Sequence, residues 1–257
     1  MSRRPRLMSS SGIYHIILRS INQHIIFEED SDYRKFLFIL SDCKEKYEVD
    51  IYAYCLMDNH IHLLMRAADE NLPLFFQSLG VRFVHWYNTK YSRVGYLFQD
   101  RYHSVPIENR RAFLNVLVYI HNNPVKANVC RIPSEYKWSS FNAYYGAKDT
   151  RVNVEFAGKV AGTKELLMQY FARSNPKEED AAFAFEHEGL PYYISDDKAL
   201  EIFKSVTGLS STSELSRIAK PKRNEYIRIL RQHRLKFKQI ARLMDVSEPT
   251  VRRVCKK

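Results

Sequence analysis

Residues 49–65 read VDIYAYCLMDNHIHLLM, two apolar runs separated by the short polar segment 57–59. β-Branched, aromatic and other apolar residues dominate both runs, which predicts strands at 49–56 and 60–65. The three residues between the runs predict a tight turn and therefore an antiparallel hairpin. The rest of the fold is predicted outward from this hairpin.

Strands and helices alternate on both sides of the hairpin. A strand predicted at 12–18 precedes a helix that starts at Asp30 or Ser31 and runs to about Tyr47. After the hairpin we expect a helix at 71–91, a strand at 96–107 and a helix at 108–122, before Pro124. The order β-α-β-β-α-β-α predicts an α+β fold, a ferredoxin-like (split βαβ) antiparallel sheet with helices on one face.

Two histidines occupy alternate positions of the second hairpin strand. Successive strand side chains point to opposite faces, so His60 and His62 share a face while Ile61 points the other way. Two imidazoles side by side are an economical start for a divalent metal site. A structural pair, half-buried and hydrogen-bonded to its neighbours, is the alternative that so short a motif leaves open.

Composition indicates a globular protein. The chain has 257 residues, 45% hydrophobic and 27% charged, which allows one large domain or two smaller ones. No run approaches 18 apolar residues and the basic N-terminus does not resemble a signal peptide, so neither a membrane span nor secretion is expected. The four cysteines lack Cys-x-x-Cys spacing, which fits a reducing, cytoplasmic location.

The net charge of +11 is concentrated at one end of the chain. Residues 217–257 hold fourteen basic and three acidic residues, whereas residues 1–216 hold 26 of each. A local basic block is typical of a nucleic-acid-binding segment. A solvated basic tail is the alternative, but apolar residues interleave with these charges at helical spacing.

The apolar spacing within 223–254 predicts a small all-α helix-turn-helix domain. Asp245 tolerates the left-handed turn, and Ser247 is a good N-cap. The last helix would then expose Thr250, Arg252 and Arg253 to DNA. A purely structural three-helix bundle is the alternative.

The helix predicted at 108–122 is followed by the sequence His121-Asn122-Asn123-Pro124. Tyr119 and Asn123 are four residues apart and so share one helical face. Tyr119 is a candidate nucleophile and Asn123 a candidate third metal ligand. Packing remains the default for a tyrosine, and a C-cap amide before Pro124 remains open for Asn123.

Four ordered motifs in about residues 10–146 resemble the single-tyrosine HUH transposases, most of all the REP-associated tyrosine transposases. His60-Ile61-His62 resembles the HUH motif, and residues 119–127 resemble the tyrosine helix. Residues 95–104 resemble the strand between them, and residues 138–141 the segment that follows.

This resemblance implies a metal-dependent single-strand DNA endonuclease and strand transferase. Tyr119 would attack a phosphate and form a 5′-phosphotyrosine, although a phenol in water ionises only near pH ~10. His60, His62 and Asn123 would hold Mg²⁺ or Mn²⁺. The retained phosphodiester would allow a second 3′-hydroxyl to reverse the step and join strands.

The implied partner is DNA, single-stranded at the cut and beside a hairpin, with the protein a monomer or homodimer. Arg101 and Lys126 are candidate contacts to its backbone. We expect three parts: a transposase domain at 1–146, a connecting helical or linker region at 147–216, and a basic DNA-binding domain at 217–257.

Two other functions compete with the enzyme. A DNA-binding regulator could keep the fold without cutting, but the intact set His60, His62 and Tyr119 favours the enzyme. An RNA-binding protein on the same kind of sheet predicts exposed aromatic residues on the central strands, where this chain has histidines.

Overall fold

The computed structural model describes residues 7–99, 101–172, 196–209, 215, 218–233 and 235–255. The chain forms two compact units, Met1–Leu190 and Pro191–Lys257, each described here by itself. In the described part of the chain, no helix combines the length and apolar character needed to cross a membrane.

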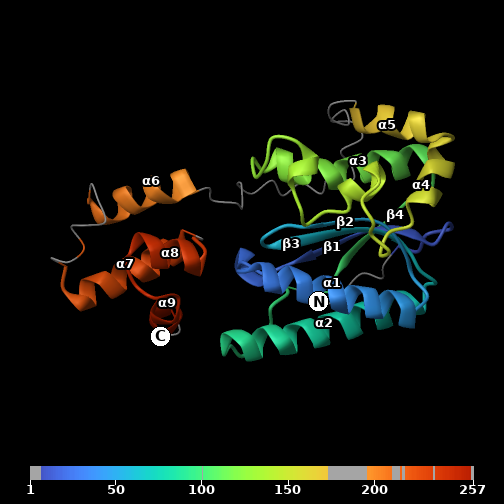
Figure 1. Ribbon diagram of the computed structural model, residues 1–257. Helices are drawn as coiled ribbons and strands as arrows, with labels where there is room; N and C mark the ends of the chain where they lie inside the picture. The colour runs from blue at the N-terminus through green and yellow to red at the C-terminus, as the bar shows by residue number, and fades with distance from the viewer. Residues whose placement is uncertain are drawn as a thin grey trace. The chain divides into compact units, whose positions relative to one another are not determined.

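A four-stranded antiparallel sheet forms the centre of the first unit (Figure 1). The order of the strands in the sheet is β2-β3-β1-β4. Their bounds are β1 Ile13–Arg19, β2 Asp50–Leu56, β3 His60–Arg66 and β4 His103–Pro106. The predicted hairpin is present, because the Met57 N–H donates to the His60 carbonyl at 2.9 Å and closes the turn. The strand with the two histidines is therefore an interior strand, as expected.

The strand register brings residues far apart in sequence into rows on one face. Arg19 of β1 lies opposite His60, and Ile17 lies opposite both His62 of β3 and His103 of β4. Residues directly opposite each other in an antiparallel pair point to the same face. One face at one end of the sheet therefore presents three imidazoles and a guanidinium.

Helices cover both faces of this sheet, so the expectation of helices on one face is wrong. In Figure 1, α1 and α2 lie on one side of the sheet and α3 and α4 on the other. The helices of this unit are α1 Asp30–Lys46, α2 Asn71–Tyr91, α3 Arg110–Lys126, α4 Val154–Ala161 and α5 Lys164–Ala172. Short 3₁₀ turns occupy Ile21–Gln23, Pro133–Glu135 and Phe141–Tyr145.

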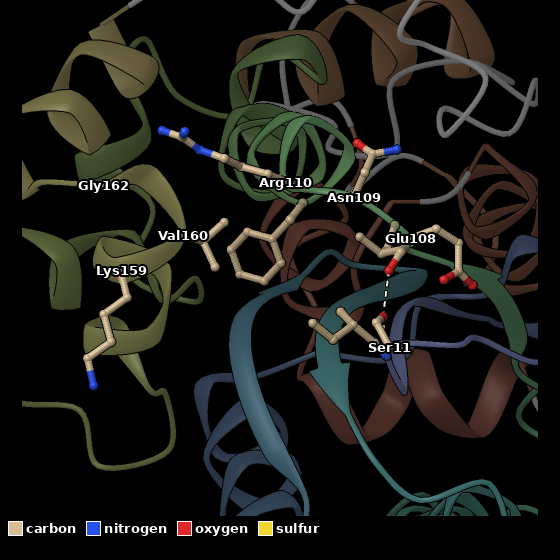
Figure 2. Close-up of a pocket in the computed structure, with 10 residues that line it drawn as sticks. Ser11, Glu108, Asn109, Arg110, Lys159, Val160 and Gly162 are labelled. Atoms are coloured by element: carbon tan, nitrogen blue, oxygen red, sulfur yellow. Dashed lines mark hydrogen bonds between the residues drawn. The ribbon is translucent and has the colours of Figure 1, made fainter.

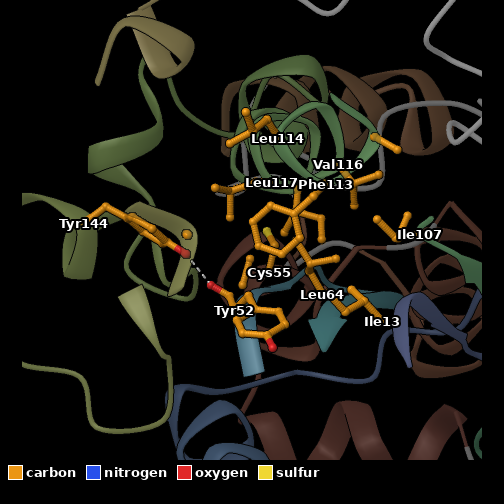
Figure 3. Packing of buried hydrophobic residues seen from close by; sticks show 14 of the residues in the cluster. Ile13, Tyr52, Cys55, Leu64, Ile107, Phe113, Leu114, Val116, Leu117 and Tyr144 are labelled. Atoms are coloured by element: carbon orange, nitrogen blue, oxygen red, sulfur yellow. Dashed lines mark hydrogen bonds between the residues drawn. The ribbon is translucent and has the colours of Figure 1, made fainter. Parts of the chain in front are cut away.

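The reason for two covered faces is visible in the strands themselves. Nearly every residue of β1, β2 and β3 is buried, with no alternation of buried and exposed positions. Continuous burial is what a sheet covered on both sides requires. On the α3 side, Phe113 and Leu117 pack against Ile13, Tyr52 and Leu64 of the sheet (Figure 3).

The fourth strand is much shorter than the predicted 96–107. Gly95 adopts φ of +100°, a conformation that only glycine reaches without strain, and the chain turns there. Residues 96–99 then follow the end of β1 as a loop. The Leu97 carbonyl accepts the Ile21 N–H, and the Gln99 N–H donates to the Arg19 carbonyl, both at 2.9 Å. Only His103–Pro106 pair with β1 as a strand.

The third helix extends beyond its predicted end and includes Pro124 in its last turn. Proline lacks an N–H, so it removes one intrahelical bond, but the next turn still closes through the Ala127 N–H and the Asn123 carbonyl at 3.0 Å. Asn123 is consequently inside the helix and not at its C-cap. Tyr119 and Asn123 lie one turn apart on a continuous helix.

The second unit contains helices with a core of their own, and their bounds are α6 Asp196–Thr207, α7 Lys220–Gln232, α8 Phe237–Leu243 and α9 Glu248–Cys255. Asp245 lies between α8 and α9 at φ of +48°, in the left-handed region expected of it. Helices of the segment 147–216 contribute to both cores. α4 and α5 add buried residues to the core of the first unit, and α6 adds Phe203 to that of the second.

Candidate active site

The two histidines of β3 converge on one side chain of α3. Nε2 of His60 lies 3.3 Å from Oδ1 of Asn123, and Nε2 of His62 lies 3.3 Å from Nδ2 of the same amide. The two imidazole rings are perpendicular, with centroids 4.8 Å apart. The structure thus brings together three residues that were predicted as ligands from separate motifs.

The other ring nitrogens of both histidines are held by the protein. Nδ1 of His60 lies 2.8 Å from Oδ1 of Asn59, the last residue of the hairpin turn. Nδ1 of His62 lies 3.0 Å from Nε2 of His15, whose ring stacks on that of His62. Partners of this kind fix ring orientation and tautomer, so each Nε2 is directed at Asn123.

Burial keeps these imidazoles neutral at physiological pH. Desolvation lowers the pKa of His60 to about 4 and that of His15 to about 3. Desolvation, together with the charges of neighbouring groups, holds the pKa of His62 well below its usual range. Neutral imidazole is the form that binds metal.

The hydrogen bonds around His60 fit a cation at its Nε2. A neutral imidazole has one N–H, yet His60 is flanked by the oxygens of both Asn59 and Asn123. If Nδ1 of His60 donates its hydrogen to Asn59, then Nε2 of His60 carries no hydrogen. Its lone pair then faces Oδ1 of Asn123, which can only accept a hydrogen bond. A divalent ion that binds both atoms would resolve this conflict.

The ligand set would be small. In the described part of the chain, no group of three or more His, Cys, Asp or Glu side chains could hold a metal ion. A metal at His60 and His62 would therefore complete its coordination with the Asn123 amide oxygen and with water or phosphate oxygens. Such a site leaves positions open for a substrate.

Tyr119 lies beside this centre. Its ring is perpendicular to that of His62, with centroids 5.6 Å apart, and contacts His15 edge-on at 5.9 Å. The ring is half-buried, and Nζ of Lys126 lies 5.1 Å from its centroid. The tyrosine, the two histidines and the asparagine therefore form one site between β3 and α3.

The predicted DNA contacts occupy different surroundings. Arg101 and Lys126 are both exposed in the first unit. In the second unit Arg253 is exposed, whereas Arg252 forms an ion pair with Glu248 at 2.5 Å. The Thr250 hydroxyl lies 2.9 Å from that of Ser247. Of the two arginines on α9, Arg253 is thus the one better placed to meet an external anion.

A cavity of about 470 Å³ lies at the opposite end of α3 (Figure 2). It is lined by residues of the first turn of α3, of α4 and of the start of β1, among them Arg110, Phe113, Val160 and Ile13. None of its lining residues belongs to the site around Tyr119. The candidate active site, between a strand and a helix, is therefore separate from this cavity.

Sequence reasoning missed His15 as a member of this site. His15 is fully buried in β1, and its partner His62 is 47 positions away. The pattern of β1 showed a histidine in an apolar strand, but only the register of β1 against β3 places it behind His62.

The buried imidazoles predict acid sensitivity of the metal-free fold. The pKa of His15 and of His121 is lowered to about 3 and that of His60 to about 4, against about 6.5 in an unfolded chain. Below pH 6.5 the unfolded state therefore binds protons that the folded state does not, so the free energy of unfolding falls as the pH is lowered. Each such histidine contributes up to about 1.4 kcal/mol per pH unit.

Urea unfolding at pH 7.0, 6.0 and 5.0 in the presence of EDTA measures this effect. We expect the midpoint to decrease at each step, and less steeply in a His121→Gln variant. Midpoints that do not change between pH 7.0 and 5.0 would contradict the neutral, buried state of these rings.

Comparison with known proteins finds transposases that are similar to the segment that carries the sheet and the candidate site. Residues 8–123 match the family model described as "Transposase IS200 like". That segment contains β1 to β4, both histidines, Tyr119 and Asn123, and over it the chain is similar to the IS200-like transposases.

Two of the similar proteins are REP-associated tyrosine transposases. A protein of Haemophilus influenzae (strain ATCC 51907 / DSM 11121 / KW20 / Rd) named as a REP-associated tyrosine transposase is 25% identical over 156 residues, which cover 55% of this chain and 86% of the relative. A REP-associated tyrosine transposase solved bound to a REP hairpin has the same fold, with a TM-score of 0.51 at 18% identity, over 62% of this chain and 93% of that one. The resemblance drawn from the four motifs is confirmed.

Proposed function

We propose that this protein is a metal-dependent single-strand DNA endonuclease and strand transferase that works through a 5′-phosphotyrosine intermediate. The observation that supports it is the convergence of Nε2 of His60 and Nε2 of His62 on Asn123, with Tyr119 one helical turn away. A nucleophile beside a pair of neutral imidazoles that could bind a metal ion suits phosphodiester transesterification.

In the proposed reaction the phenol oxygen of Tyr119 attacks the phosphorus of a DNA phosphodiester. A bond forms between that oxygen and phosphorus, and the bond from phosphorus to the 3′ oxygen breaks. The phenol loses a proton and the departing 3′ oxygen gains one, so the products are a 5′-phosphotyrosine and a free 3′-hydroxyl. Attack by another 3′-hydroxyl reverses the step and joins strands without an external energy source.

The surrounding residues hold the reactants. His60 and His62 would bind Mg²⁺ or Mn²⁺ with Asn123, and the ion would supply positive charge against the phosphate oxygens. His15 and Asn59 keep the two imidazoles in the orientation that presents Nε2. The helix carries Tyr119 at a fixed distance from the sheet, which favours in-line attack over a search by a mobile side chain.

The substrate we propose is single-stranded DNA at or near a hairpin. A solved relative of the same fold is bound to a REP hairpin. Exposed Lys126 lies beside the Tyr119 ring, and the described positions of the second unit add several exposed basic residues. We propose that this second unit, with α8, the turn at Asp245 and α9, binds the duplex stem as a helix-turn-helix domain.

Incubation of the protein with labelled single-stranded hairpin oligonucleotides and Mn²⁺ tests the function. We expect a covalent protein–DNA adduct that survives denaturing electrophoresis, with mass spectrometry placing the DNA on Tyr119. Binding of the same oligonucleotides without any adduct, across Mg²⁺ and Mn²⁺, would instead support the regulator that binds but does not cut.

Removal of the second unit, by ending the chain at residue 190, is expected to weaken binding to a hairpin stem at least tenfold near physiological salt. Residues 217–257 hold the entire net charge of +11, and each lost phosphate contact lowers the slope of log K against log salt by about 0.9. Fluorescence anisotropy at several salt concentrations measures both quantities. Affinity and slope equal to those of the full chain would refute a DNA-binding role for this unit.

A further inference from the structure

Arg19 is the last residue of β1 and lies directly opposite His60. Its side chain is on the face of the sheet that holds the candidate active site, and it is half-buried. The backbone on either side is fixed, because its carbonyl accepts the Gln99 N–H and the next N–H, of Ser20, donates to the Asn59 carbonyl, both at 2.9 Å. The base of this long side chain is therefore held rigidly beside the metal-binding histidines.

Among the residues that the structure describes, Arg19 makes no side-chain hydrogen bond and no ion pair. Other arginines of the first unit differ in this respect, because Arg66 pairs with Asp50 at 2.6 Å, Arg82 with Asp42 at 2.7 Å and Arg151 with Asp149 at 2.7 Å. Partial removal of a charge from water costs free energy unless an opposite charge replaces the water. An unpaired guanidinium at this place therefore indicates an anion from outside the chain.

Arg19 lies close to the histidines of the candidate site. The strand register sets it opposite His60, and Ile17, two residues before it on the same face, lies opposite His62 and His103. Lys126 supplies a second cation on the α3 side, above the Tyr119 ring. Arg19 and Lys126 therefore supply positive charge on the sheet side and on the helix side of the candidate site.

We propose that Arg19 binds the non-bridging oxygens of the phosphate that Tyr119 attacks, a role that rests on the proposed function. The planar guanidinium matches two phosphate oxygens at once, which lysine does not. As the reaction proceeds, negative charge is distributed over the non-bridging oxygens and the attacking and departing oxygens of the phosphate. A cation at this point therefore stabilises the transition state as well as the bound DNA.

Arg66, at the other end of the sheet, offers a matched control for the substitution of Arg19. Arg66 is the last residue of β3 and pairs in register with Ile13, so it shares a face with Arg19, but Asp50 already neutralises it. The variants Arg19→Gln, Arg19→Lys and Arg66→Gln change one residue each. Circular dichroism and thermal unfolding are the checks that all three variants fold.

Equilibrium binding of a fluorescein-labelled single-stranded hairpin oligonucleotide is the first measurement and needs no catalysis. We expect Arg19→Gln to bind three- to tenfold more weakly, with the salt slope reduced by about 0.7. Arg19→Lys should keep the slope, and Arg66→Gln should match the wild type. Wild-type affinity and slope in Arg19→Gln would overturn the phosphate contact.

The single-turnover rate of adduct formation at saturating DNA is the second measurement. We expect Arg19→Gln to lower it at least about 100-fold, since the contact strengthens in the transition state, and Arg19→Lys to recover only part of the loss. A wild-type rate in Arg19→Gln would overturn the placement at the attacked phosphate. Failure of the wild type to form any adduct would instead count against the proposed function, while the binding measurement would still decide whether Arg19 holds a phosphate.

Discussion

Tyr119→Phe is expected to abolish the covalent protein–DNA adduct, with a loss of at least about 10⁴-fold. The variant lacks the phenol oxygen that would attack the phosphorus. The ring is half-buried against His62 and His15, and the substitution keeps that packing. Folding and DNA affinity should therefore remain close to those of the wild type. The adduct contains the DNA that lies 3′ of the cut, so a 3′-labelled oligonucleotide detects it and a 5′-labelled one does not.

A second tyrosine controls for the general effect of removing a hydroxyl. Tyr145 lies in the 3₁₀ turn Phe141–Tyr145 and is 54% exposed, so Tyr145→Phe should form the adduct at the wild-type rate. An undiminished adduct in Tyr119→Phe would show that another residue is the nucleophile. Equal losses in both variants would point to an indirect effect on folding.

His60→Ala is expected to weaken Mn²⁺ binding at least 100-fold and to remove cleavage with it. His60 is one of two imidazoles whose Nε2 faces the Asn123 amide, and a single remaining imidazole with an amide is a poor ligand set. Electron paramagnetic resonance of free Mn²⁺ measures the binding without DNA. The adduct assay in EDTA measures the dependence of cleavage on metal.

His85→Ala is the matched control, because His85 is exposed on α2, on the opposite face of the sheet from the site. It should bind Mn²⁺ as the wild type does. Equal Mn²⁺ affinity in His60→Ala would refute the metal site, and an adduct yield unchanged by EDTA would refute the role of metal in cleavage.

Local sequence patterns were enough to predict which strand face and which helix face carry the site residues. The hairpin 49–65 placed His60 and His62 on one face of an interior strand, and the spacing of Tyr119 and Asn123 placed them on one helical face. Both inferences needed only the periodicity of a strand and of a helix. The meeting of these two elements was predicted by resemblance to a family rather than by spacing, because it depends on the packing of α3 on the sheet.

Features that depend on long-range pairing were missed or predicted wrongly. The role of His15 follows from the pairing of β1 with β3, which no local pattern contains. The assignment of helices to one face overlooked the lack of regular alternation between apolar and polar residues in the strands, which itself indicated two covered faces. The helix end before Pro124 was set by a rule about proline that the last turn of α3 does not obey, since its neighbours still close the hydrogen bonds.

Burial of the central strands on both faces has a consequence for motion. Backbone amides at the middle of β1 and β3 open only when most of the first unit unfolds, so they belong to the slowest-exchanging part of the molecule. The floor that holds His62 is thus effectively static during a catalytic cycle. We expect any displacement that admits a DNA strand and later releases it to occur outside β1 and β3.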